Sequence, residues 1–115
     1  MSSIHALWTF NQTAKGIIPQ MLSASDYWQP DNVSSWYNKS ATTALAKAQL
    51  FNTKRSQADE VYCKESLKLT ITANARIDNR SDLLKALSLK SEDVSTDSQL
   101  ILAAYVYWGR ECPRY

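Results

Sequence analysis

The sequence is poor in the residues that build metal sites and disulfide frameworks. Its 115 residues include two cysteines, Cys63 and Cys112, and one histidine, His5. The two cysteines are isolated, and their spacing fits neither a zinc site nor a disulfide-stapled domain. We therefore expect no metal ion and no disulfide framework, and we interpret these three residues as strand or packing residues.

Long apolar runs and clusters of one charge are also missing. No segment approaches the roughly 20 apolar residues that a transmembrane helix needs, and the start MSSIHALWTF lacks the features of a secretion signal. The densest basic run is Lys54-Arg55, and two acidic residues follow it at 59 and 60. Because nucleic-acid binding needs a clustered basic face, we do not expect it here. The sequence predicts a cytoplasmic protein without membrane or nucleic-acid partners.

The composition is that of an ordinary globular domain, with 44% hydrophobic and 21% charged residues. Alternation of apolar and polar residues predicts strands. These cover residues 3–10, 60–63 and 67–77. Residues 43–51 fit either a strand or a short helix by composition, and we interpret them as a strand. A short helix is expected around 17–22 with Pro19 in its first turn. The polar segment 26–43 is interpreted as an irregular loop.

Two helices are predicted in the last third of the chain. Asn79 suits the N-cap of the first, whose buried stripe would be Leu83, Leu84 and Leu87. Thr96 and Gln99 form a capping box for the second, and Gly109 suits its end. The second helix is apolar nearly all round, so we expect other elements to cover it on more than one side. The pattern predicts an α+β fold with strands first and two C-terminal helices.

Two segments of this region carry a resemblance to a known family. "LTITANARIDNRSDLLKAL" (69–87) and "TDSQLILAAYVYWGRECPRY" (96–115) are similar to the N-terminal glutaminase domain of asparagine synthetase-like proteins. Those domains are class II glutamine amidotransferases with the N-terminal-nucleophile fold, an αββα sandwich of antiparallel strands. The resemblance is close over 67–115 and weak over 11–66. It implies that residues 1–115 form a single glutaminase-like domain, which we expect to be truncated.

The resemblance also implies roles for individual residues. Ser2 stands at the position of the family nucleophile, a cysteine exposed by removal of the initiator methionine, whose own amine acts as general base. Asn74 and Ala75 stand at the positions that supply oxyanion donors. Asp97 matches the acid that holds the α-amine of substrate glutamine.

Other positions depart from the family pattern. Gln49 stands where the family has the arginine that binds the substrate α-carboxylate, and glutamine cannot reproduce that bidentate contact. Arg76 stands where the family often has an acid. The serine at position 2 is a poorer nucleophile than a thiolate. We therefore expect a degenerate pocket without glutaminase activity.

Two functions remain open. The chain is either the non-catalytic glutaminase-like domain of an ATP-dependent amide-forming protein of the asparagine synthetase type, or a stand-alone binding or dimerisation module with the same fold. In the first case its partner is a synthetase domain, which alone would bind ATP and magnesium. In the second case self-association would use the last helix. No cofactor is expected in these 115 residues.

Overall fold

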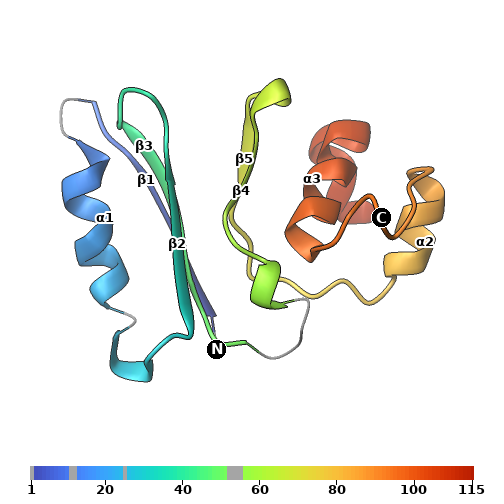
Figure 1. The fold of residues 1–115 in the computed structure, drawn as a ribbon. Coiled ribbons are helices and arrows are strands. Elements are labelled where there is room, and N and C mark those ends of the chain that lie inside the picture. Colours follow the sequence, from blue (N-terminus) through green and yellow to red (C-terminus); the bar gives the residue numbers. More distant parts are fainter. Residues whose placement is uncertain (1, 11–12, 25, 52–55) are drawn as a thin grey trace.

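Helix, sheet, second sheet and helices follow one another as four layers (Figure 1). The computed structural model describes residues 2–10, 13–24, 26–51 and 56–115. The described chain is mixed α+β, with three α-helices and two antiparallel sheets. The predicted α+β class is therefore confirmed. The basic run Lys54-Arg55 lies outside the described residues.

The first sheet contains β1 (Ser2–Trp8), β2 (Asn32–Tyr37) and β3 (Thr43–Gln49) in the order β1-β3-β2. The strand predicted at 43–51 is thus confirmed, and it is the central one. Helix α1 (Ala14–Ser23) covers one face of the sheet (Figure 1). The buried core of this interface consists of three alanines and one isoleucine, namely Ala14, Ile18, Ala44 and Ala46. Alanines in β3 let the helix lie close to the strand.

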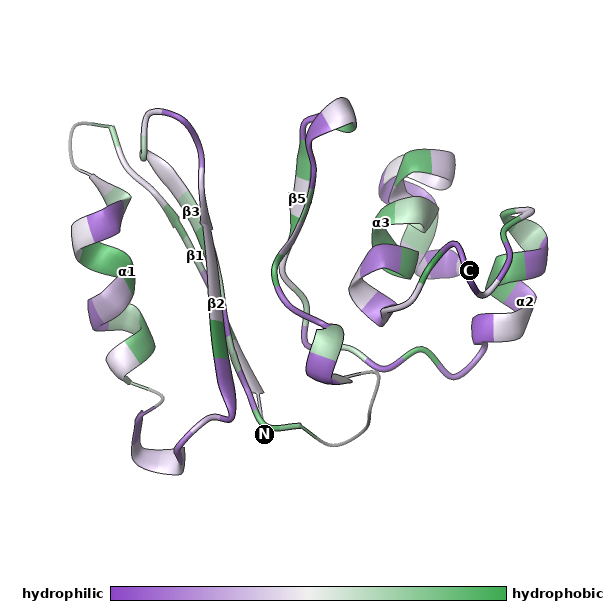
Figure 2. Ribbon diagram, viewed as in Figure 1, coloured by the Kyte–Doolittle hydropathy of each residue, from purple (hydrophilic) through white to green (hydrophobic). Residues whose placement is uncertain are grey.

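Two details of this half differ from the sequence predictions. The segment 26–43 is not an irregular loop, because it contains a 3-10 turn at Asp26–Trp28 and strand β2. Strand β2 is largely hydrophilic, as Figure 2 shows, which hides its alternation. Pro19 lies in the middle of α1 and not in its first turn, because the helix begins earlier, after the N-cap Thr13. Pro19 is exposed there.

The second sheet pairs β4 (Tyr62–Lys64) with β5 (Leu69–Ile71). A 3-10 turn at Glu65–Leu67 joins them, and Lys68 follows with a left-handed φ of 53°. The strand predicted over 67–77 is therefore too long, because only its first part pairs. After Ile71 the chain leaves the ladder and turns side chains toward the first sheet, where Thr72 Oγ1 donates to the carbonyl of Ala46 at 3.2 Å.

Helices α2 (Arg80–Ala86) and α3 (Asp97–Trp108) form the last layer and confirm the two predicted helices. The Thr96 hydroxyl accepts from Gln99 N at 3.2 Å, and Gly109 ends α3 with a φ of 59°. Asn79 is at the N-cap position of α2, but its side chain does not cap the helix. Its Nδ2 instead donates to the carbonyl of Tyr115 at 2.8 Å.

The side chains buried in the helical layer are larger than those buried between α1 and the first sheet. The buried cluster of the helical layer consists of Leu83, Leu84, Leu87, Val94, Leu100 and Ala104. The predicted leucine stripe of α2 is thus confirmed. None of the helices in the described part of the chain has both the length and the apolar character for crossing a bilayer.

Candidate functional site

Three of the residues singled out from the sequence meet at one end of the first sheet. Ser2 is paired with Gln49 across β1 and β3. Asn74, which follows β5, donates from Nδ2 to the carbonyl oxygen of Ser2 at 3.2 Å. Gln49 is 3% exposed. The register of the sheet and the departure of the chain from β5 therefore bring together positions that lie up to 72 residues apart in the sequence.

The two residues after Asn74 point away from any enclosed site. Ala75 is exposed. The Arg76 side chain is 88% exposed, and its Nε donates to Asp78 Oδ1 at 2.8 Å. Solvent screens such an exposed ion pair, so it contributes little to stability. Arg76 therefore holds a surface position, although its neighbour Asn74 reaches the strand end.

Asp97 is the one acid among these residues, and its carboxylate already has internal partners. Oδ1 accepts from Arg80 Nη1 at 2.8 Å, and Oδ2 accepts from the backbone N–H of Ile77 at 3.3 Å. Both side chains of the ion pair are 13% exposed. Arg80 Nη2 also donates to the carbonyl of Val94. Asp97 thus ties the start of α3 to α2 and to the segment before it.

A buried ion pair that the sequence did not reveal lies beside this region. Lys47 Nζ contacts Asp59 Oδ2 at 3.1 Å and the Asp59 carbonyl oxygen at 2.6 Å. The two side chains are 5% and 10% exposed. Asp59 Oδ1 accepts from the backbone N–H of Ser98, in the first turn of α3, at 3.2 Å. These three residues link the first sheet to the last helix.

One signal in the sequence could have revealed this link. Lys47 is the only charged residue in TALAKAQ, the central strand, where a charge must be buried. A buried ammonium needs a carboxylate and further hydrogen bonds, because desolvation is costly. The partner could not be chosen from the sequence, since no pattern singles out one of the 11 acids of the chain. The buried Ser98 Oγ, in contrast, has no hydrogen-bond partner among the described residues.

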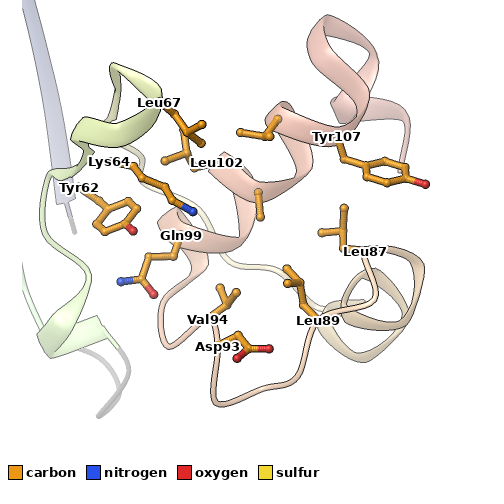
Figure 3. Close-up of a pocket in the computed structure, with 12 residues that line it drawn as sticks. Tyr62, Lys64, Leu67, Leu87, Leu89, Asp93, Val94, Gln99, Leu102 and Tyr107 are labelled. Atoms are coloured by element: carbon orange, nitrogen blue, oxygen red, sulfur yellow. The ribbon is translucent and has the colours of Figure 1, made fainter.

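A pocket of about 510 Å³ lies between the second sheet and the helices (Figure 3). Its walls come from β4, α3 and the segment after α2. In Figure 3, Tyr62, Lys64 and Gln99 lie together at one end, while leucines line much of the rest. None of the site residues predicted from the sequence lines this pocket. The sequence missed it because its walls come from separate segments, each of which resembles ordinary core.

Comparisons with known proteins add no relative. No protein-family model, no curated protein and no solved structure matches this chain. No group of three or more histidine, cysteine, aspartate or glutamate residues able to hold a metal ion is found within the described ranges. The candidate site is therefore the strand-end cluster of Ser2, Gln49 and Asn74, whose residues the resemblance singled out and whose contacts the structure describes.

Proposed function

We propose that this chain is a glutaminase-like domain of an asparagine synthetase-type, ATP-dependent amide-forming protein, and that it does not hydrolyse glutamine. The observation that carries the proposal is that the Asp97 carboxylate is bonded within the protein. This carboxylate is paired with the Arg80 guanidinium and accepts from the N–H of Ile77 at 13% side-chain exposure, so a protein cation already occupies the place that a substrate amine would take. The four layers of Figure 1 support the N-terminal-nucleophile fold as the framework.

The chemistry at the strand end supports the loss of activity. Attack on a carboxamide needs a nucleophile, a base that accepts its proton and donors for the oxyanion. The Ser2 hydroxyl reacts more slowly than a thiolate, and the nitrogen of Ser2 can act as a base only as a free amine. Asn74 Nδ2 already donates to the Ser2 carbonyl, which leaves one of its two N–H groups for another acceptor.

Binding of the substrate α-carboxylate is weakened as well. An amino-acid substrate carries a carboxylate, which an arginine would bind through two parallel N–H donors. Gln49 is neutral and 3% exposed in the central strand, so it offers neither the charge nor the reach of a guanidinium. In this proposal the protein acts in the cytoplasm, and a synthetase domain that binds ATP and magnesium is its partner.

The direct test is incubation of the purified chain with glutamine and measurement of glutamate and ammonia. We expect no release above that of the Ser2→Ala variant. Release by the unchanged chain that disappears in Ser2→Ala contradicts the proposal.

A gain-of-function variant tests the pocket itself. Ser2→Cys combined with Gln49→Arg restores the thiol and the guanidinium. With Met1 removed, we expect an electrophilic glutamine analogue to label the new cysteine, as mass spectrometry would show. Ser2→Cys alone is the control, and it should label more slowly. Equal labelling of both variants would mean that Gln49 does not face the substrate carboxylate.

A second function is favoured by one feature of α3. Tyr105, Val106 and Tyr107 are 42%, 51% and 66% exposed, so apolar side chains near the end of that helix are uncovered on more than one side. Such exposed apolar surface suits a stand-alone binding or dimerisation module. A Tyr107→Lys variant that loses self-association would favour this alternative.

A further inference from the structure

The outer edge of β1 has unpaired main-chain groups. Thr9 N donates to the carbonyl of Thr42 at 2.7 Å, so residue 9 continues the β1–β3 register as a hydrogen-bonded pair. Bonded and non-bonded pairs alternate in an antiparallel ladder. The odd-numbered residues of β1 therefore bond to β3, and Ile4, Ala6 and Trp8 point their N–H and C=O groups outward. In the described part of the chain, the outward main-chain groups of these three residues make no hydrogen bond to another element.

The side chains of the same residues form an apolar surface. They lie on the sheet face opposite α1, and Ile4 and Trp8 are 50% and 66% exposed. Phe10, just past the strand, is 83% exposed, and its ring lies 4.5 Å from that of Trp8 between centroids. This exposed surface of Ile4, Ala6, Trp8 and Phe10 is called the β1 face below.

Asn74 Nδ2 donates to the carbonyl of Ser2 at the start of β1, but from Ile4 to Trp8 the strand has none of the usual protection of an edge strand. Its seven residues, SSIHALW, contain no lysine, arginine, acid or proline, and its register with β3 is continuous without a bulge. Natural proteins use charges, prolines and bulges to prevent edges from pairing. The other edge strand, β2, differs because two of its side chains form hydrogen bonds with the segment before β4. Asn32 bonds Glu60 at 2.8 Å, and Ser34 Oγ accepts from Val61 N at 3.0 Å.

We propose that two copies of this chain associate through β1, antiparallel about a two-fold axis at Ala6, to form a continuous six-stranded sheet. Hydrogen-bonding parity requires even-numbered residues to pair with even-numbered residues across the new edge, and among the axes that satisfy this condition we choose Ala6, the centre of the outward-facing residues Ile4, Ala6 and Trp8. Ala6 then pairs with Ala6 of the second copy, and Ile4 lies opposite Trp8 of the second copy. An aromatic residue opposite a β-branched one is a favourable cross-strand pair.

Size and charge fit a second copy as the occupant. Trp8 and Phe10 expose on the order of 300 Å² in each copy, so the two copies contribute roughly 600 Å² before Ile4, Ala6 and the strand backbone are added. A specific interface needs about 1,000 Å² in total. Because β1 contains no aspartate, glutamate, lysine or arginine, like charges of these residues do not oppose each other across the axis.

The decisive variant is Ala6→Pro. It removes the outward N–H of both Ala6 residues but no bond to β3, and proline is tolerated where an edge N–H faces solvent. Sedimentation across the micromolar range should show a dimer for the unchanged chain. For Ala6→Pro the dissociation constant should be at least about tenfold higher, equivalent to about 1.4 kcal/mol. Circular dichroism establishes that the variant is folded.

Charge substitutions test the register and do not depend on the proline variant. Ile4→Lys and Trp8→Glu should each weaken the dimer, and the double variant should recover part of the loss because the two new charges lie opposite each other. Tyr107→Lys on α3 is the matched control and should leave the dimer intact. A monomer at every concentration, or a dimer lost with Tyr107→Lys and kept with Ala6→Pro, overturns the inference. The inference is independent of the proposed loss of glutaminase activity.

Discussion

The two halves of the molecule bury different side chains. The half made of α1 and the first sheet packs alanines and one isoleucine, whereas the half made of α2 and α3 packs four leucines, a valine and an alanine. Apolar burial contributes roughly in proportion to area, so the helical half gains more from its side chains. The sheet half depends more on its backbone ladder, in which β3 pairs with β1 along its whole length and with β2 from Ala44 to Gln49. The same fold thus combines two sources of stability.

The largest effect should come from breaking the link between the halves. Lys47→Met leaves the Asp59 carboxylate buried without its cation, and we expect a loss of about 3–5 kcal/mol in the free energy of unfolding. Urea denaturation measures it. Arg76→Ala, which breaks an exposed pair, is the control and should cost less than about 0.5 kcal/mol. If Lys47→Met lowers the free energy of unfolding no more than Arg76→Ala does, the Lys47–Asp59 pair contributes little to stability.

The next test compares the two cores directly. Leu100 is fully buried, and Leu100→Ala should cost about 2–5 kcal/mol because it leaves a cavity. The corresponding change in the sheet half is enlargement, since Ala46 is fully buried under α1. Ala46→Leu should cost about 1–3 kcal/mol through overpacking.

Thermal unfolding of these two variants, followed by circular dichroism, is the measurement. If Ala46→Leu leaves the unfolding temperature unchanged, the interface with α1 has room for a larger side chain, and the proposed difference between the two cores is wrong.

The smallest effect concerns the helix caps. Thr96 is 2% exposed, and its cap is reinforced because Gln99 Oε1 accepts from Ser95 N at 2.9 Å. Thr13 is exposed and accepts from Lys15 N at 3.3 Å. We expect Thr96→Ala to cost about 1–2 kcal/mol and Thr13→Ala about 0.5 kcal/mol. Chemical denaturation of both variants gives the ratio, and a larger loss at Thr13 would contradict it.

The elements with strong local signals were predictable from the sequence. The leucine spacing of α2, the cap and terminal glycine of α3, and the alternation of β1 each reflect short-range geometry, whereas the composition of β3 also fitted a short helix. Strand β2 was missed because NVSSWY carries few apolar residues, and its pairing with β3 depends on partners distant in the sequence. The length of β5 was overestimated, since alternation continues after Ile71 although pairing does not.

The candidate site shows the same division. The meeting of Ser2, Gln49 and Asn74 was implied by the resemblance, and the structure brings these three residues together. The partners of Asp97 were not foreseen, because Arg80 reaches it from the other helix. The apolar face of β1 was expected from its alternation, but its exposure was not, because exposure depends on how far the second sheet extends over the first.

The aromatic stack at the end of α3 provides a spectroscopic marker for one half of the protein. The rings of Trp108 and Tyr115 lie 4.3 Å apart between centroids at 10° to each other, and Tyr107 contacts Trp108 edge-on at 5.1 Å. Near-ultraviolet dichroism from this cluster should report the melting of the helical layer. Fluorescence of Trp36 in β2, measured in a variant whose other three tryptophans are replaced by phenylalanine, should report the sheet layer. Coincident curves would mean that the layers melt as one cooperative unit. Separate curves would mean that each layer is a unit of its own.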